Sequence, residues 1–219
     1  MNIHIVVEGV IGEAKVYKAW VPLVNPSLSY ASHISEVVSD NFSIVAGGGF
    51  PQYYDIIDAA IDDVNTHANI QRLVISVDSE EFSYEDKYNE IQDHISDSSC
   101  SAEIRIVVQH FCLETWALGN QVILTRHPHS DRLREYINFF NVSIEDPELL
   151  PGYSQEQLNR AHFAVKYLKC ALNEKFSRLT YSKSNPIALL HPNYFKRVKQ
   201  RLDNTGHIKS FEHFLGAFV

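Results

Sequence analysis

Acidic residues follow three apolar segments of this 219-residue sequence, at the points where those segments end. Glu8 follows the segment IHIVV. Asp78 and Glu80 follow RLVISV, and His110 and Glu114 come after IRIVV. Carboxylates that are brought together repel one another, and desolvation makes each charge more costly, so such a group shifts its pKa values or binds a cation.

The cation that suits oxygen ligands best is a hard divalent ion, Mg²⁺ above all, with Mn²⁺ as a second choice. A metal so held can polarise a phosphodiester oxygen, activate water and stabilise the departing oxygen. Asp78 and Glu80 are two residues apart and would project to the same side of an extended segment. An aspartate after a strand is also a favoured helix cap, and this structural interpretation of Asp78 remains open.

Strands and helices must alternate to bring these acids together. Short apolar, β-branched runs predict buried strands at 3–7, 43–46, 72–77 and 104–108. Helical spacing predicts helices at 13–20, 53–64 and 84–95, and Pro22 is expected to end the first of them. This alternation predicts an α/β fold with a mostly parallel sheet flanked by helices. Ligands bind beyond the carboxyl ends of strands in such sheets, so the acids would share one edge.

The two parts of the chain differ in charge and in pattern. Residues 1–120 hold 5 Lys and Arg against 18 Asp and Glu, whereas residues 121–219 hold 14 against 9. The second part predicts helices at 130–140, 154–176 and 186–203, followed by a short apolar tail, FEHFLGAFV. We therefore predict a domain at 1–120 and a helical, basic C-terminal region at 121–219. The overall net charge of −8 hides two parts of opposite sign.

Composition excludes several protein classes. The chain is 45% hydrophobic and 21% charged, which is unlike a collagen or a disordered chain. No apolar run approaches the ~20 residues needed to span a bilayer, and the first residues lack the basic region of a secretory signal. Three cysteines without C-x-x-C spacing form neither a disulfide framework nor a zinc site. We expect a cytoplasmic protein without a membrane partner.

Two motifs resemble those of TOPRIM domains, which occur in topoisomerases, primases, recombination proteins and OLD-family nucleases. They are IHIVVEG at 3–9 and RLVISVDSE at 72–80. The segment FCLETWALGN at 111–120 resembles a stretch of RloB-like and related small TOPRIM proteins of prokaryotic defence systems. The resemblance covers about residues 1–120 and implies a parallel sheet flanked by helices, with acids that hold Mg²⁺.

The resemblance also implies roles for single residues. Glu8 matches the first TOPRIM glutamate, a metal ligand or general base, and Asp78 matches the first acid of the aspartate pair. Glu80 stands where the family has a second aspartate, so its side chain is one methylene longer. Glu114 resembles the later glutamate of the RloB-like group. We therefore expect Glu8, Asp78 and Glu80 to be both catalytic residues and metal ligands.

Other residues are secondary candidates. Lys15 could reach a phosphate from the first helix, or be solvated, and His110 could join the site or make a structural hydrogen bond. A late helix carries four basic residues, which form either a solvated face or a surface for a nucleic-acid backbone: Lys196, Arg197, Lys199 and Arg201. The stretch AGGGFP at 46–51 lacks the endings of nucleotide-binding loops and predicts a sharp turn.

These observations lead to one main expectation and two alternatives. The main expectation is a Mg²⁺-dependent nuclease that cuts DNA or tRNA-like RNA as the effector of an antiphage defence system. A partner ATPase of the ABC or OLD type would control it, because the chain has no energy-coupling motif. Whether the chain forms an oligomer is left open. The alternatives are a non-catalytic TOPRIM-like interaction subunit of an ATPase complex, and a primase or topoisomerase fragment.

Overall fold

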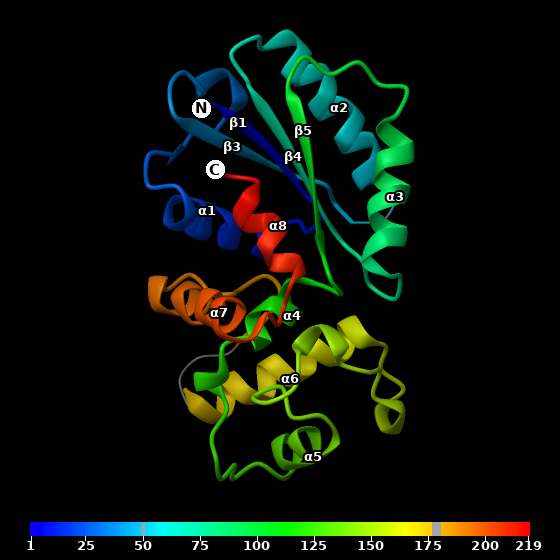
Figure 1. The fold of residues 1–219 in the computed structure, drawn as a ribbon, viewed down its shortest axis with the longest axis vertical. Helices are drawn as coiled ribbons and strands as arrows, with labels where there is room; N and C mark the ends of the chain where they lie inside the picture. The colour runs from blue at the N-terminus through cyan, green and yellow to red at the C-terminus, as the bar shows by residue number, and fades with distance from the viewer. Residues whose placement is uncertain (50, 177–180) are drawn as a thin grey trace. The chain divides into compact units, whose positions relative to one another are not determined.

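The computed structural model describes residues 1–49, 51–176 and 181–219, which form two compact units. The first unit comprises residues 1–77, 84–108 and 213–219, and the second comprises 78–83 and 109–212. This division falls near residue 108 rather than at 120, and the last seven residues return to the first unit (Figure 1).

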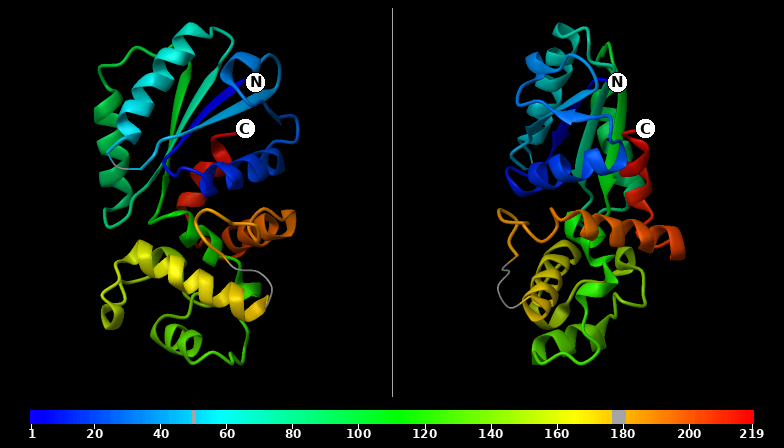
Figure 2. Two further views of the ribbon diagram at one scale, coloured as in Figure 1. Left: turned by 180° about the vertical axis from the view of Figure 1, so that it is seen from behind. Right: turned by 90° about the vertical axis from the view of Figure 1, so that its left-hand side faces the viewer.

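A parallel five-stranded sheet confirms the predicted α/β fold. Its strand order is β2–β3–β1–β4–β5 (Figures 1 and 2). The strands are β1 (Ile3–Val7), β2 (Ser29–Tyr30), β3 (Asn41–Ala46), β4 (Arg72–Asp78) and β5 (Glu103–Gln109). Ile5 of β1 lies opposite Ile44 on one side and Val74 on the other. β1 is therefore the central strand, and its five residues are all buried, as a continuous apolar run predicts.

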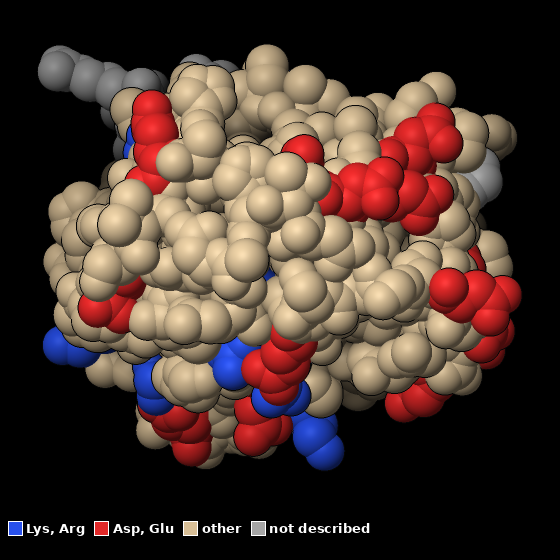
Figure 3. Space-filling model, turned by 90° about the horizontal axis from the view of Figure 1, so that it is seen from above, with Lys and Arg blue, Asp and Glu red and all other residues tan. Residues whose placement is uncertain are grey.

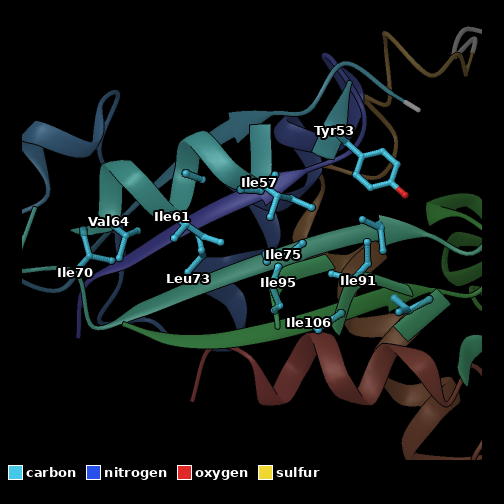
Figure 4. Packing of buried hydrophobic residues seen from close by; sticks show 14 of the residues in the cluster. Tyr53, Ile57, Ile61, Val64, Ile70, Leu73, Ile75, Ile91, Ile95 and Ile106 are labelled. Atoms are coloured by element: carbon cyan, nitrogen blue, oxygen red, sulfur yellow. The ribbon is translucent and has the colours of Figure 1, made fainter. Parts of the chain in front are cut away.

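Helices cover both faces of this sheet. One face carries α2 (Tyr53–Thr66) and α3 (Tyr84–Ile95), which follow the predicted helices closely. The apolar stripes of these two helices bury Ile57, Ile61 and Ile91 against strand residues such as Ile75 and Ile106 (Figure 4). Period-2 alternation along β4 gives Leu73, Ile75 and Val77 to this core and Val74 and Ser76 to the opposite face.

The opposite face carries α1 (Gly12–Val24) and the end of the chain. α8 (Ser210–Gly216) begins in the second unit, and its Phe214 packs edge-to-face on Tyr17 and Trp20 of α1, at centroid distances of 5.0 and 6.1 Å. Arg72 Nη1 donates to the carbonyl oxygen of Ala217 at 2.8 Å. The apolar tail predicted from sequence is thus a helix that completes the core of the first unit.

The prediction that Pro22 ends the first helix is wrong. α1 continues through Pro22 to Val24, and the N–H of Asn25 donates to the carbonyl of Val21 at 2.9 Å. Proline at position 22 has no N–H to donate to the Lys18 carbonyl, so the helix loses one i→i−4 hydrogen bond. Trp20 and Val21 are fully buried, and their burial offsets the lost hydrogen bond.

The second unit is helical, as predicted for the C-terminal extension. Its helices are α4 (Leu113–Leu118), α5 (Asp131–Phe139), α6 (Arg160–Lys175) and α7 (Pro192–Thr205). Short 3-10 turns lie at Gln121–Ile123, Pro147–Leu149 and Ser154–Glu156, and one more, Ile34–Glu36, lies in the first unit. Tyr136, Tyr153 and Phe163 pack ring against ring in its core, with centroids 4.9 to 5.2 Å apart.

Two of the helices begin later than the sequence predicts. α6 begins at Arg160 rather than at 154, because Gln157 adopts a left-handed conformation with φ of 53° and Asn159 caps the helix. α7 begins at Pro192, six residues after the predicted start at 186. Proline is favoured as the first residue of a helix because its missing N–H has no partner there.

No helix in the described part of the chain is long and apolar enough to cross a membrane. Acidic side chains form several patches on the face shown in Figure 3, and basic ones gather along one border of that view.

Candidate functional site

The backbone of Glu8 lies at the carboxyl end of the central strand. Val7 is opposite Ser76 in β4, and the N–H of Glu8 donates to the Ser76 carbonyl at 3.1 Å. The Glu8 carbonyl accepts from the N–H of Gly49 at 3.0 Å. Glu8 itself is half-buried. Glu8 therefore lies immediately after a buried strand, as predicted, and the structure places its backbone next to the end of β4.

The glycine-rich segment after β3 is a turn that closes on this strand end. Gly47 donates its N–H to the Val7 carbonyl at 2.6 Å, and Gly48 and Gly49 have φ values of 78° and 85°. These left-handed conformations favour glycine. The predicted sharp turn is present at 47–49, and Phe50, which belonged to the same motif, lies outside the described residues.

Glu13 is a buried acid at this strand end that the sequence analysis missed. Its side chain belongs to the first turn of α1, and only 8% of the residue is exposed. Oε2 accepts from the N–H of Gly9 at 2.6 Å, and Oε1 accepts from the Ser76 hydroxyl at 3.3 Å. A Cβ on Gly9 would lie 2.9 Å from Glu13 Oε2. Glycine at position 9 leaves room for the close approach of this carboxylate, and the spacing of Gly9 and Glu13 was the available signal.

A second polar network lies at the start of α2 in the same unit. Glu90 of α3 accepts hydrogen bonds from Tyr53 at 2.8 Å, from Tyr54, and from the buried Lys87 at 2.9 Å. Burial, the hydrogen bond with Glu90 and, more weakly, the negative charge of Glu8 raise the pKa of the Tyr54 hydroxyl. Glu8 is therefore within electrostatic range of the first turn of α2.

Asp78, Ser79 and Glu80 belong to the second unit. Asp78 is half-buried, with its Oδ1 atom buried, whereas Glu80 is exposed. The N–H of Glu80 donates to the Phe111 carbonyl at 2.8 Å, and Glu80 has a left-handed φ of 49°. The chain is therefore not extended from Asp78 to Glu80, since β4 ends and a turn begins. The simple alternation that predicted a shared side for the two acids does not hold.

His110 and Glu114 have structural partners in the second unit. Nδ1 of His110 and the hydroxyl of Ser79 are hydrogen-bonded at 2.8 Å, which joins the segments after β4 and β5. Glu114 is buried in α4 and accepts from the Tyr181 hydroxyl at 2.6 Å. Burial and the adjacent Glu114 carboxylate raise the pKa of Tyr181. Burial, followed by the charges of Glu114 and Asp78, raises the pKa of the Cys112 thiol well above its usual value.

The predicted basic surface of α7 contains three exposed residues rather than four. Lys196, Arg197 and Lys199 are exposed, and Lys199 forms an ion pair with Asp203 at 2.7 Å. Arg201 is 2% exposed. Its guanidinium donates to four consecutive backbone carbonyls, at residues 142–145, over 2.9 to 3.3 Å. Arg201 is therefore a structural residue and not part of a surface for nucleic acid. Lys15 is exposed on α1.

The donor chemistry of Glu8, Asp78 and Glu80 suits Mg²⁺, because all three offer carboxylate oxygens. Within the described residues, however, no group of three or more His, Cys, Asp or Glu side chains has an arrangement that could hold a metal ion. A preformed ligand cage is thus absent from this part of the chain.

Comparison of the chain with protein-family models, with curated proteins and with solved structures gave no match. The resemblance to TOPRIM domains therefore rests on the two strand-end motifs and on the parallel sheet that carries them.

Proposed function

We propose that this chain is a Mg²⁺-dependent TOPRIM nuclease that cleaves phosphodiester bonds in DNA or RNA. One observation carries the proposal: the central strand β1 is followed by Glu8, and its parallel neighbour β4 ends at Asp78. Functional groups of open parallel sheets gather at the carboxyl ends of adjacent strands. Glu8, which is followed by Gly9, and Asp78 lie at two such adjacent strand ends, and this is the pattern of the motifs IHIVVEG and RLVISVDSE.

The proposed roles follow from chemistry at these positions. The sequence motifs assign Mg²⁺ to Glu8, Asp78 and Glu80, whose carboxylates would have to come together to hold it, because they form no preformed cage in the described residues. The ion, when bound, would polarise a phosphodiester oxygen and stabilise the departing one. Glu8 would accept the proton of the attacking water. Lys15 on α1 is exposed and would contact a substrate phosphate. His110 and Glu114 support this segment through Ser79 and Tyr181 rather than by touching the substrate.

Nucleic acid as the substrate is supported by the basic second part of the chain. Lys196, Arg197 and Lys199 are exposed on one helix, where they would contact the phosphate backbone. Contacts of this kind supply affinity that does not depend on sequence and that falls with salt. A cleavage assay with labelled DNA and labelled RNA distinguishes the two possible substrates, DNA and tRNA-like RNA.

A partner ATPase of the ABC or OLD type is also part of the proposal, with the chain as the effector of an antiphage defence system. It is supported by the sequence, which contains neither a P-loop nor a dinucleotide-binding glycine motif. An energy-coupled activity would then require a second protein. The alternative function is a non-catalytic TOPRIM-like interaction subunit of such a complex.

Cleavage by the Glu8→Ala variant tests the proposal. The purified chain is incubated with labelled DNA and labelled RNA in the presence of Mg²⁺ or Mn²⁺. We expect Glu8→Ala to reduce cleavage by about 100-fold or more, since it removes a metal ligand and proton acceptor. Glu85→Ala removes an exposed carboxylate of α3 and is the matched control. Circular dichroism checks the fold of both variants.

Full cleavage by Glu8→Ala would overturn the assignment. Calorimetry separates the nuclease from the alternative function. Absence of Mg²⁺ and Mn²⁺ binding at millimolar metal concentration would favour the interaction subunit, whose acids would only stabilise the loops that they occupy.

A further inference from the structure

A cavity in the second unit lies between the segment 121–128 and α5. Figure 1 labels α5 at the bottom of the view. Its volume is about 650 Å³. Cavities that bind small molecules have volumes of about 300–1,000 Å³. The cavity is thus large enough for a ligand of nucleotide size, and none of the residues proposed for the nuclease reaction lines it.

The charges around this cavity favour an anion. Its lining includes Arg126, His127 and Arg134 but no Asp or Glu, in a protein with a net charge of −8. Arg134 is held by Asp131 and by the Pro128 carbonyl at 3.1 Å, which offsets part of its charge. Arg126 is exposed and makes no ion pair or hydrogen bond with the described residues, so its guanidinium is available to a ligand.

A second observation concerns Thr125, which lines the same cavity. Its hydroxyl oxygen is buried and has no hydrogen-bond partner within the described ranges. Buried polar atoms are nearly always hydrogen-bonded, and an exception requires an explanation. A polar ligand in the cavity would supply the missing partner after rotation of the Thr125 side chain, because the hydroxyl oxygen is buried from the cavity itself.

The remaining lining suits a base rather than a second phosphate. Leu124 and Ile137 give apolar contact, and Asn138 offers an amide group, whereas the Oδ1 atom of Asn141 already accepts two hydrogen bonds from Ser143. Amide side chains pair well with the edge of adenine, because they donate and accept side by side. We propose that this cavity binds a nucleoside phosphate, with Arg126 on the phosphate and with the apolar and amide residues on the base.

Calorimetric titration of the whole chain tests this proposal. The ligands are ATP, GTP and AMP, with inorganic phosphate and adenosine as the two partial ligands. We expect at least one nucleoside phosphate to bind about tenfold or more tightly than either partial ligand, since only the whole molecule engages both parts of the lining. Arg126→Ala should weaken this binding by about tenfold or more, because it removes a charge-assisted hydrogen bond.

Matched variants locate the binding. Arg132→Ala removes an exposed arginine of α5 that does not line the cavity, and it should leave the Kd within about twofold of the original value, as expected for a distant surface change. Thr125→Val removes the buried hydroxyl with little change of shape and should also weaken binding. Glu8→Ala should bind the nucleotide normally, which separates this cavity from the proposed metal ligands.

Any of three binding results would overturn the proposal, as would a fourth that concerns oligonucleotides. The three are the absence of nucleoside phosphate binding at millimolar concentration, unchanged binding by Arg126→Ala, and equal binding of inorganic phosphate. A 5′-phosphorylated oligonucleotide that binds where mononucleotides do not would also overturn it, in favour of a strand-binding surface. Thermal melting checks folding, and Arg126→Ala decides the test if Thr125→Val does not fold.

Discussion

At the scale of single residues, Glu13 is the acid most tightly held at the end of the central strand. It accepts from the Gly9 N–H and from the hydroxyl of Ser76, which is itself hydrogen-bonded to the Tyr17 hydroxyl at 2.5 Å. A carboxylate placed here fixes the turn that follows Glu8. Its position in the first turn of α1 is also favourable, because the helix dipole stabilises a negative charge there.

We predict that Glu13→Ala lowers the free energy of unfolding by about 1–3 kcal/mol, because the Gly9 N–H and the Ser76 hydroxyl lose a buried acceptor. Glu13→Gln keeps an acceptor oxygen and should cost less. Urea unfolding measures both variants. The control, Asp62→Ala, removes an exposed acid of α2 and should change stability by no more than about 0.5 kcal/mol. Equal effects of Glu13→Ala and Asp62→Ala would contradict this account.

Sequence predicted some of these residues and missed others for a physical reason. Glu8 could be placed because it directly follows an apolar run whose strand character is local. The spacing of Glu13 from Gly9 is local, but the burial of Glu13 could not be predicted, because it depends on Ser76, 63 residues away. The same holds for Glu114, whose partner Tyr181 is 67 residues away, and for Arg201, whose backbone carbonyl acceptors lie more than 50 residues earlier. The spacing of residues in sequence shows which of them share a face of a helix or strand. It does not show which distant residues pack against that face.

At the scale of elements, interiors were more predictable than ends. The apolar stripes of α2 and α3 follow from a period of 3.6 residues, and both helices match the prediction closely. The start of α6 depends instead on Asn159, whose side chain accepts from the His162 N–H at 2.8 Å. Leu158 fits the helical spacing, but it pairs with Tyr153 in an antiparallel bridge before the helix begins.

A carboxylate links two further elements, and its protonation should be visible in stability. Glu148, in the turn Pro147–Leu149, accepts from the N–H of Ser210 at 2.9 Å, at the start of α8. Burial raises the pKa of Glu148 to about 7, although hydrogen bonds from Ser210 oppose the shift. Because the folded pKa is higher than the unfolded one, this contribution is complete below about pH 4.5 and is lost as pH rises through 7.

We predict that Glu148→Gln removes this pH dependence. The difference in unfolding free energy between the variant and the original protein should change in favour of the variant as pH rises from 5 to 7, by at most about 1.4 kcal/mol per pH unit. Urea unfolding at several pH values measures it. All other groups titrate alike in the two proteins, so their effect is absent from the difference between the two unfolding free energies. If that difference stayed constant from pH 5 to 8, Glu148 would not titrate in this range.

At the scale of the whole molecule, chain order and spatial order differ. The sequence places a boundary near residue 120, where the charge changes sign, but the last seven residues complete the core of the first unit. Besides the Arg72 contact with Ala217, the side-chain amide of Asn25 donates to the Phe218 carbonyl at 2.9 Å. The end of the chain therefore stabilises the unit that contains Glu8, although the second unit separates the two in sequence.

We predict that Phe214→Ala lowers the free energy of unfolding by about 3–5 kcal/mol, because it leaves a cavity beside Tyr17 and Trp20. Phe214 is fully buried, whereas the side chain of Val219 is exposed, so Val219→Ala is the matched control and should cost less than about 0.5 kcal/mol.

The hydroxyl of Tyr17 is hydrogen-bonded to Ser76, which is itself a hydrogen-bond partner of Glu13. Loosening of the Tyr17 ring should therefore affect the turn after Glu8. Amide hydrogen exchange of residues 8–13 should therefore be faster in Phe214→Ala and unchanged in Val219→Ala. Loss of stability without faster exchange there would limit Phe214 to a packing role.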